Sequence, residues 1–176
     1  MQRYDLTAEM YEERYAHEQE AKYGAALENV DVADCSVLDV GCGSGLFFSH
    51  VTAKAKVLVG VDSSRKLLLK AKEQTHSFQN VSVLQADADH LPFRKAFFDV
   101  VFAFTVLQNM PNPSETLKEL QISASPDACF VVTGLKAAFS LYKFSIVLQK
   151  AGLRAVSLRD DEALRCYVTT AIRNPN

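Results

Sequence analysis

The chain has 176 residues, which is the length of a single domain. Hydrophobic residues make up 48% and charged residues 23%, a composition that fits a globular protein and excludes a disordered or collagen-like chain. The 19 basic and 21 acidic residues nearly cancel, so the net charge of −2 gives no overall electrostatic reason to bind nucleic acid or an anionic membrane, although a local basic patch stays open.

Membrane spans, export signals and metal sites are not predicted. The longest apolar run, Val100 to Leu107, is far shorter than the roughly 20 residues that span a bilayer. The first residues are too polar for the apolar region of a signal peptide, so we expect a cytoplasmic protein. Cysteines and histidines are scattered without ligand spacing, which argues against a metal.

Hydrophobic periodicity predicts an opening helix over about Thr7 to Leu27, in which Glu18 stands four residues before Lys22 and can pair with it. Short apolar runs and helices then alternate. The predicted strands are Ser36–Val40, Lys56–Asp62, Val81–Ala86, Asp99–Thr105, Ala128–Gly134, Ala155–Arg159 and Arg165–Thr170. The predicted helices are Leu46–Ala55, Ser64–Gln74, Asn112–Ser123 and Ser140–Ala151.

This alternation predicts an α/β fold with one Rossmann-like, doubly wound sheet and helices on both faces. We expect one domain with three parts. Residues 1–30 form an N-terminal helical lid, residues 35–134 a cofactor-binding core, and residues 135–176 a helix followed by a two-strand hairpin.

A glycine-rich turn ends the first predicted strand. The segment VLDVGCGSGLF places Gly41, Gly43 and Gly45 where the strand gives way to a helix. Open parallel sheets bind ligands at this edge, and glycine lets a ligand approach the main chain closely. A merely tight strand-to-helix turn is the alternative interpretation.

The spacing of this turn argues against a dinucleotide. Dinucleotide-binding folds carry GxGxxG, but the third glycine of that pattern falls at Leu46 here. Asp39 stands just before the turn, where those folds usually keep an apolar residue. Because a carboxylate repels a pyrophosphate and attracts an amino or sulfonium cation, we expect a cationic ligand.

Two more acids end the next two predicted strands. Asp62 closes the second strand, from which a carboxylate can accept hydrogen bonds from ribose hydroxyls. Asp87 follows the third, where it can accept from an adenine amino group while Ala88 supplies a main-chain donor. Each aspartate alone could equally serve as a helix cap or a turn residue. Because acids end successive strands around a glycine turn, however, the pattern favours one shared site.

With these motifs the sequence resembles the class I methyltransferases that use S-adenosylmethionine, in the group with DxGCGxG, GxD, DAxxLPF and FDxV. The resemblance spans about Tyr4 to Lys136. It implies a seven-stranded sheet with the last strand antiparallel, which matches the two tail strands. It also implies that Asp39 and the glycines hold the methionine moiety and that Phe104 lines the pocket near the methyl group. The predicted cofactor residues are Asp39, Gly41, Cys42, Gly43, Asp62, Ser63, Asp87, Ala88 and Phe104.

The methyl acceptor is not identified by these motifs. After the fourth strand, relatives that act on amide or amino nitrogens show Asn or Asp before Pro-Pro and an aromatic residue, and many that act on small molecules place a histidine there. This chain has Gln108 and Asn109, which orient an acceptor or only bond the main chain. Tyr4, Tyr11 and Tyr15 of the opening helix are further acceptor candidates, or anchors of that helix on the sheet.

We therefore predict a methyltransferase that acts on a small molecule, a protein or RNA. The basic residues of 65–72 are more typical of a solvated helix face than of an RNA contact. One alternative is a non-catalytic S-adenosylmethionine-binding subunit that regulates a partner protein. A dinucleotide-dependent oxidoreductase is a third possibility, disfavoured by Leu46 and Asp39.

A partner is also predicted from Val81 to Ala86. The resemblance places this strand at an open edge of the sheet, and the segment QTHSFQNVSVLQA has no charged residue or proline to protect it. Either a loop covers the edge, or another chain adds a strand to it, as in relatives that work with a small zinc-binding activator protein. We expect pairing with such an activator or with a second copy.

Overall fold

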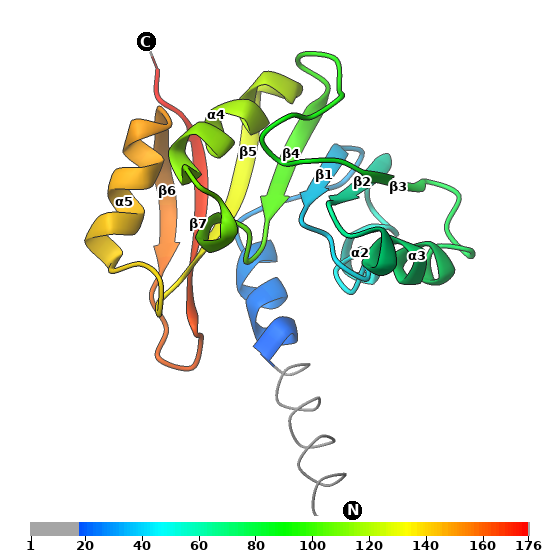
Figure 1. Cartoon of the computed structure of the whole chain (residues 1–176), viewed down its shortest axis with the longest axis horizontal. Helices are drawn as coiled ribbons and strands as arrows, with labels where there is room; N and C mark the ends of the chain where they lie inside the picture. The colour runs from blue at the N-terminus through cyan, green and yellow to red at the C-terminus, as the bar shows by residue number, and fades with distance from the viewer. Residues whose placement is uncertain (1–17, 176) are drawn as a thin grey trace, which may run out of the picture.

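The computed structural model describes residues 18–175, and Figure 1 shows their arrangement around one twisted sheet. The seven strands have the order β3-β2-β1-β4-β5-β7-β6, and β7 runs antiparallel to both neighbours. This confirms the predicted fold class, including the antiparallel last strand. The strands are β1 Ser36–Val40, β2 Val57–Asp62, β3 Val81–Gln85, β4 Phe98–Ala103, β5 Ala124–Leu135, β6 Leu153–Arg159 and β7 Cys166–Arg173.

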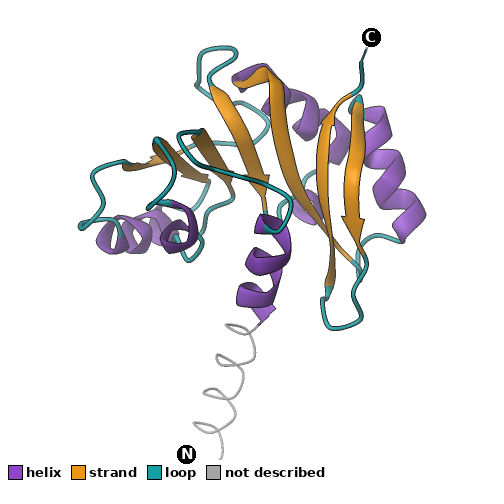
Figure 2. Ribbon diagram, turned by 180° about the vertical axis from the view of Figure 1, so that it is seen from behind, coloured by secondary structure: helices purple, strands orange, loops and turns teal. Residues whose placement is uncertain are grey.

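Helices cover both faces of the sheet. A helix over residues 18–27 precedes β1. The others are α2 Phe48–Val51, α3 Arg65–Gln74, α4 Pro113–Ser123 and α5 Leu141–Lys150, with a 3-10 turn η1 at Leu107–Asn109. Figure 2 shows α3 beside β2 and β3 at one end of the sheet and α5 beside β6 at the other. None of the helices in the described part of the chain is long and apolar enough to cross a membrane.

Two apolar clusters form the core, one on each face of the sheet. One cluster packs α4 and α5, through Leu117 and Phe144, on β1, β4 and β5. The other packs the helix of residues 18–27, α2 and α3 on the opposite face, through Tyr23, Phe48 and Leu68. All five residues of β1 are buried because both its faces are covered, which explains why Val37, Leu38 and Val40 are apolar.

The expected helix over Leu46–Ala55 was wrong in extent, because α2 is only the four residues Phe48–Val51. The chain leaves the helix early in order to re-enter the sheet at β2. Asn80 compensates for the lost helical hydrogen bonds, since its Nδ2 donates to the carbonyl oxygens of Thr52 and Ala55, both at 2.9 Å. The side chain of a residue distant in the sequence thus supplies the donors that a further helical turn would have provided.

Two further differences lie around β4 and β5. The segment after β4 forms η1, which the sequence did not indicate. The fifth strand begins at Ala124, directly after α4 and before the expected Ala128. The start of this strand was not predicted because its first residues include polar ones. The pairing with β4 shifts register in this region, between Phe98 and Val100.

Candidate cofactor and acceptor site

A cleft opens at the carboxyl ends of β1, β2 and β4. It consists of two adjoining cavities of about 380 and 480 Å³. Both cavities are lined by Gly41, Asp62, Leu67, Thr105 and Asn109. The strand-end residues that the sequence singled out therefore meet in one place, as the parallel topology requires.

The glycine turn forms one wall of the larger cavity. Gly41 and Gly43 have φ angles of 69° and 57°, which side chains rarely adopt. A Cβ atom at Gly43 would meet no protein atom within 4 Å. The main chain at Gly43 therefore faces open space, where a ligand can approach it.

Asp39, in β1, is buried beside this turn. Its residue is 2% exposed and lines the larger cavity. Burial, followed by the nearby charge of Asp62, raises the pKa of Asp39 well above its ordinary value. No hydrogen-bond donor among residues 18–175 pairs with its carboxyl group. A buried carboxyl without a partner fits a cationic group such as an amino or sulfonium group.

Asp62 holds the two loops of the site together. Its Oδ2 accepts from the main-chain N–H of Gly43 at 2.9 Å, and its Oδ1 accepts from that of Ser64 at 2.8 Å. Each oxygen keeps a further lone pair for a ligand hydroxyl. The exposed Ser63 follows Asp62 and lines the smaller cavity. Asp62 thus shapes the glycine turn, a role that sequence reasoning missed.

Asp87 and Ala88 both line the smaller cavity. Asp87 also builds its own turn, because Oδ1 accepts from the N–H of Asp89 at 3.0 Å and its carbonyl accepts from the N–H of His90. Asp87 is therefore a turn residue, and its place in the lining of the cavity leaves it available to a ligand.

Phe104 belongs to an aromatic cluster under the larger cavity. Its ring lies 5.1 Å from that of Tyr23 and 4.9 Å from that of Phe47, measured between centroids. Phe104 is mostly buried but lines the cavity. Cys42 lines it too, and burial raises the pKa of its thiol, which disfavours the nucleophilic thiolate.

The acceptor candidates separate into three groups. Tyr4, Tyr11 and Tyr15 lie outside the described residues. Asn109 is exposed and lines both cavities, and its Nδ2 donates to the carbonyl of Thr105 at 3.2 Å. Gln108 lines neither cavity, and its Nε2 bonds the same carbonyl. Both amides thus bond the main chain, and only Asn109 also faces the cleft.

Thr105 and Lys22 were not among the sequence candidates. Thr105 follows β4 with a φ of 61°, a rare conformation for a β-branched residue. Its Oγ1 accepts from Lys22 Nζ at 3.0 Å. The expected pair between Glu18 and Lys22 was wrong, because Glu18 instead pairs with Arg165 at 3.2 Å. Helical spacing shows which residues share a helix face but not which distant strand end meets that face.

Metal ligands do not gather in the part of the chain that the structure describes. No group of three or more His, Cys, Asp or Glu side chains there could hold a metal ion. The four cysteines are free. The site is therefore built from carboxyl groups, main-chain amides and aromatic rings.

Comparison with known proteins identifies the family. The model of the methyltransferase domain family matches residues 38–132, which is more than half of the chain. A ubiquinone biosynthesis O-methyltransferase from Azoarcus sp. (strain BH72) is 32% identical over 122 residues, which cover 66% of this chain and 51% of that protein. The chain thus spans about half the length of this curated relative.

Solved structures share the fold. A SAM dependent methyltransferase from Aquifex aeolicus superposes with a TM-score of 0.77 at 19% identity, covering 85% of this chain and 88% of that one. The Haloferax volcanii complex of the Trm112 methyltransferase activator with a putative methyltransferase contains a chain with a TM-score of 0.79 at 17% identity, covering 99% of this chain and 96% of that one. The family model matches more than half of the chain, and the sheet order and the glycine turn are consistent with that match. The chain therefore belongs to the methyltransferase domain family, the class I enzymes that use S-adenosylmethionine.

Proposed function

We propose that the protein transfers the methyl group of S-adenosylmethionine to an oxygen of a small aromatic acceptor. The observation that carries the proposal is the buried carboxyl group of Asp39 beside the glycine turn, which has no hydrogen-bond donor among residues 18–175 and suits the cationic end of this cofactor. The choice of acceptor is supported by the relative named for ubiquinone biosynthesis O-methylation. When bound, the cofactor supplies an electrophilic methyl group on a sulfonium.

We assign different residues of the cleft to the methionine, ribose and adenine parts of the cofactor. Asp39, with the turn from Gly41 through Cys42 to Gly43, would hold the methionine moiety. Asp62 and Ser63 would accept hydrogen bonds from the ribose hydroxyls. Asp87 would accept from the adenine amino group, and the main chain of Ala88 would donate to the ring. Phe104 would close the cavity near the methyl group.

The remaining task of the chain is positioning. Methyl transfer from a sulfonium is an in-line displacement, so holding the acceptor in line and excluding water provide most of the acceleration. The helix of residues 18–27 packs Tyr23 over Phe47 and Phe104, at one side of the larger cavity. Residues 1–30 would act as the lid of the site, and of these, residues 1–17 lie outside the described part of the chain.

Binding and transfer are tested in two steps. Calorimetry with S-adenosylhomocysteine and with NAD should show one site for the former and much weaker binding of the latter. Methyl-labelled cofactor is then incubated with protein and a cell extract that is separated into small-molecule, protein and RNA pools. Label in the small-molecule pool supports the proposal, and tighter binding of NAD or label confined to another pool contradicts it.

A second candidate function is that of a cofactor-binding subunit that regulates a partner. The observation in its favour is β3, which pairs with no strand of residues 18–175 other than β2 and exposes Ser82 and Leu84. The Haloferax volcanii structure is a complex with an activator protein. We propose that β3 accepts a strand from an activator or from a second copy. Label in no pool, together with tight cofactor binding, would favour this function.

A further inference from the structure

Lys22 is a buried lysine that contacts Thr105, one of the residues that line the cleft. Its residue is 2% exposed. Its Nζ donates to Gln19 Oε1 and to Thr105 Oγ1, both at 3.0 Å. An ammonium group has three N–H donors, so these two neutral partners leave one donor without a described partner.

The acid nearby is paired elsewhere. Glu18, whose charge acts on Lys22, pairs with Arg165 at 3.2 Å. Within residues 18–175, no carboxylate lies within salt-bridge distance of Lys22. Burial lowers the pKa of Lys22, and Cys166 and Glu18 offset this only in part. A buried ammonium without a counter-ion is costly, and an anionic ligand would remove that cost.

A side cavity of about 160 Å³ lies against this ammonium. Its lining includes Lys22 and Thr133, together with Arg165 and the Glu18 carboxylate that pairs with it. Gln19 and Thr105 line both this cavity and the larger part of the cleft. The side cavity therefore adjoins the cleft at these two residues, whose side chains both bond the Lys22 ammonium.

Thr105 is fixed at the boundary between the two spaces. Its N–H donates to Thr133 Oγ1 at 2.8 Å, and its carbonyl accepts from Asn109. These bonds hold the residue in its left-handed conformation, which a β-branched residue keeps only when its surroundings enforce it. The position of the Lys22 ammonium is thus set by a rigid strand end and not by a mobile loop.

We propose that the side cavity is the acceptor subsite and that the Lys22 ammonium binds an anionic oxygen of the methyl acceptor there. The oxygen belongs either to a carboxylate that orients the acceptor or to an ionised phenolic hydroxyl that receives the methyl group. This inference rests on the proposed function, because it treats the larger cavity as the cofactor's place. It further predicts that the methyl acceptor carries a negative charge, a property that the residues of the cofactor site do not determine.

Binding of small probes tests the proposal. Benzoate, ionised 4-nitrophenol and the neutral benzamide are titrated into the protein saturated with S-adenosylhomocysteine. At least one anion should bind about tenfold or more tightly than benzamide, since a hydrogen bond between two charged groups is stronger than one to a neutral amide. A preference for benzoate identifies the orienting carboxylate, and a preference for the phenolate identifies the reacting oxygen.

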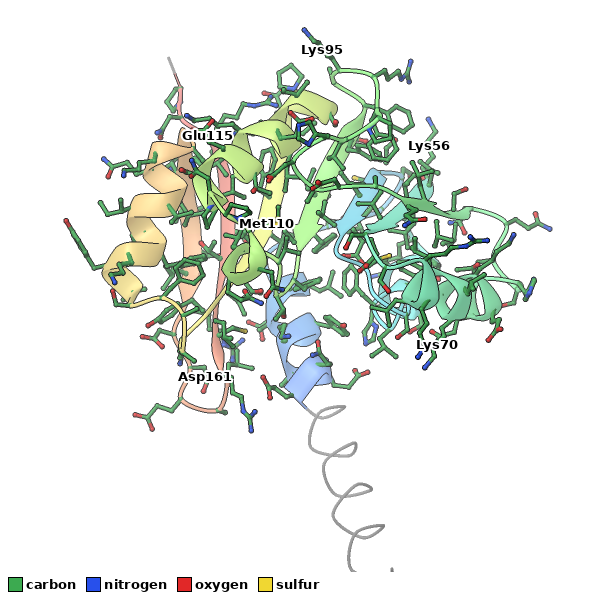
Figure 3. All side chains as sticks on the ribbon, viewed as in Figure 1. Lys56, Lys70, Lys95, Met110, Glu115 and Asp161 are labelled. Carbon is green, nitrogen blue, oxygen red and sulfur yellow. The ribbon has the colours of Figure 1, made fainter. Side chains whose placement is uncertain are left out.

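Two variants locate the effect. Lys22→Met keeps the length of the side chain without its charge and should abolish the preference for the anion. Lys70→Met removes one lysine from the exposed face of α3 (Figure 3) and should leave the preference unchanged. Equal binding of anions and benzamide by the wild-type protein overturns the proposal, whatever the variants do. Failure to bind S-adenosylhomocysteine at all would instead contradict the proposed function.

Discussion

Asp39 places opposite demands on stability and on cofactor binding. An ionised carboxyl group without a partner in the core destabilises the fold, while the same charge would attract the cationic end of the cofactor. We therefore expect Asp39→Asn to weaken binding of S-adenosylmethionine about tenfold or more, as loss of a charge-assisted contact does. Calorimetry on the folded variant measures this. Unchanged affinity would show that the carboxyl group does not face the cofactor.

The same substitution should change how stability depends on pH. Because the pKa of Asp39 is raised in the folded protein, the folded state holds a proton that the unfolded chain releases from about pH 4 upward. The contribution of this residue to stability is full below that pH and falls as the pH rises through the folded pKa. Urea unfolding of both proteins across this range should show Asp39→Asn gaining stability relative to wild type. A constant difference would contradict the raised pKa.

Gly43 and Gly152 separate backbone strain from ligand contact. Both have positive φ angles, 57° and 78°, and a Cβ atom at either would meet no protein atom within 4 Å. We expect Gly43→Ala and Gly152→Ala each to lower the free energy of unfolding by about 1–2 kcal/mol, the cost of a left-handed alanine. Only Gly43→Ala should also weaken S-adenosylmethionine binding, because its methyl group projects into the cleft. Equal affinities in calorimetry would remove Gly43 from the site.

At the scale of elements, α2 depends on a residue outside it. Asn80 Nδ2 donates to two carbonyl groups that follow the helix, those of Thr52 and Ala55. We expect Asn80→Ala to lower the free energy of unfolding by about 1–3 kcal/mol, the usual cost of leaving buried acceptors without a donor. Asn80→Asp keeps the size of the side chain but places an acceptor against acceptors, so it should cost more. Urea unfolding of both variants checks the order, and a milder Asn80→Asp would contradict it.

The elements that could be predicted from the sequence are those with a local cause. β1 and β4 are mostly apolar because both faces of the sheet are covered there, and α4 begins at Pro113 after Asn112 as the sequence indicates. The early end of α2 could not be predicted, because the side chain that satisfies the carbonyl groups of Thr52 and Ala55 is Asn80, which is distant in the chain. The same holds for Lys22, whose partner Thr105 lies 83 residues away. The sequence motifs predicted which acids lie at the cleft, whereas the position of Lys22 next to Thr105 depends on tertiary packing.

At the scale of the whole molecule, the two edges of the sheet differ in charge. β6 carries Arg154 and Arg159 at one edge, and charged edge residues discourage strand addition. β3 carries no charge at the other edge, where Leu84 is 40% exposed. Val81 and Val83 pack against the core, so Ser82 is the residue at which a new charge would project outward. The asymmetry favours β3 as the edge that receives a partner.

Ser82→Lys tests this edge, with Ala155→Lys on β6 as the matched control. If a second copy pairs through β3, sedimentation of the wild-type protein should show a dimer whose fraction rises with concentration, and Ser82→Lys should shift it to monomer by opposing strand addition. If an activator pairs there, the wild type alone is monomeric, and its turnover should rise with the activator in a manner that Ser82→Lys removes. Ala155→Lys should change neither result. A wild-type monomer with full turnover on its acceptor and no partner would rule out pairing at β3, since the edge would then be open without consequence.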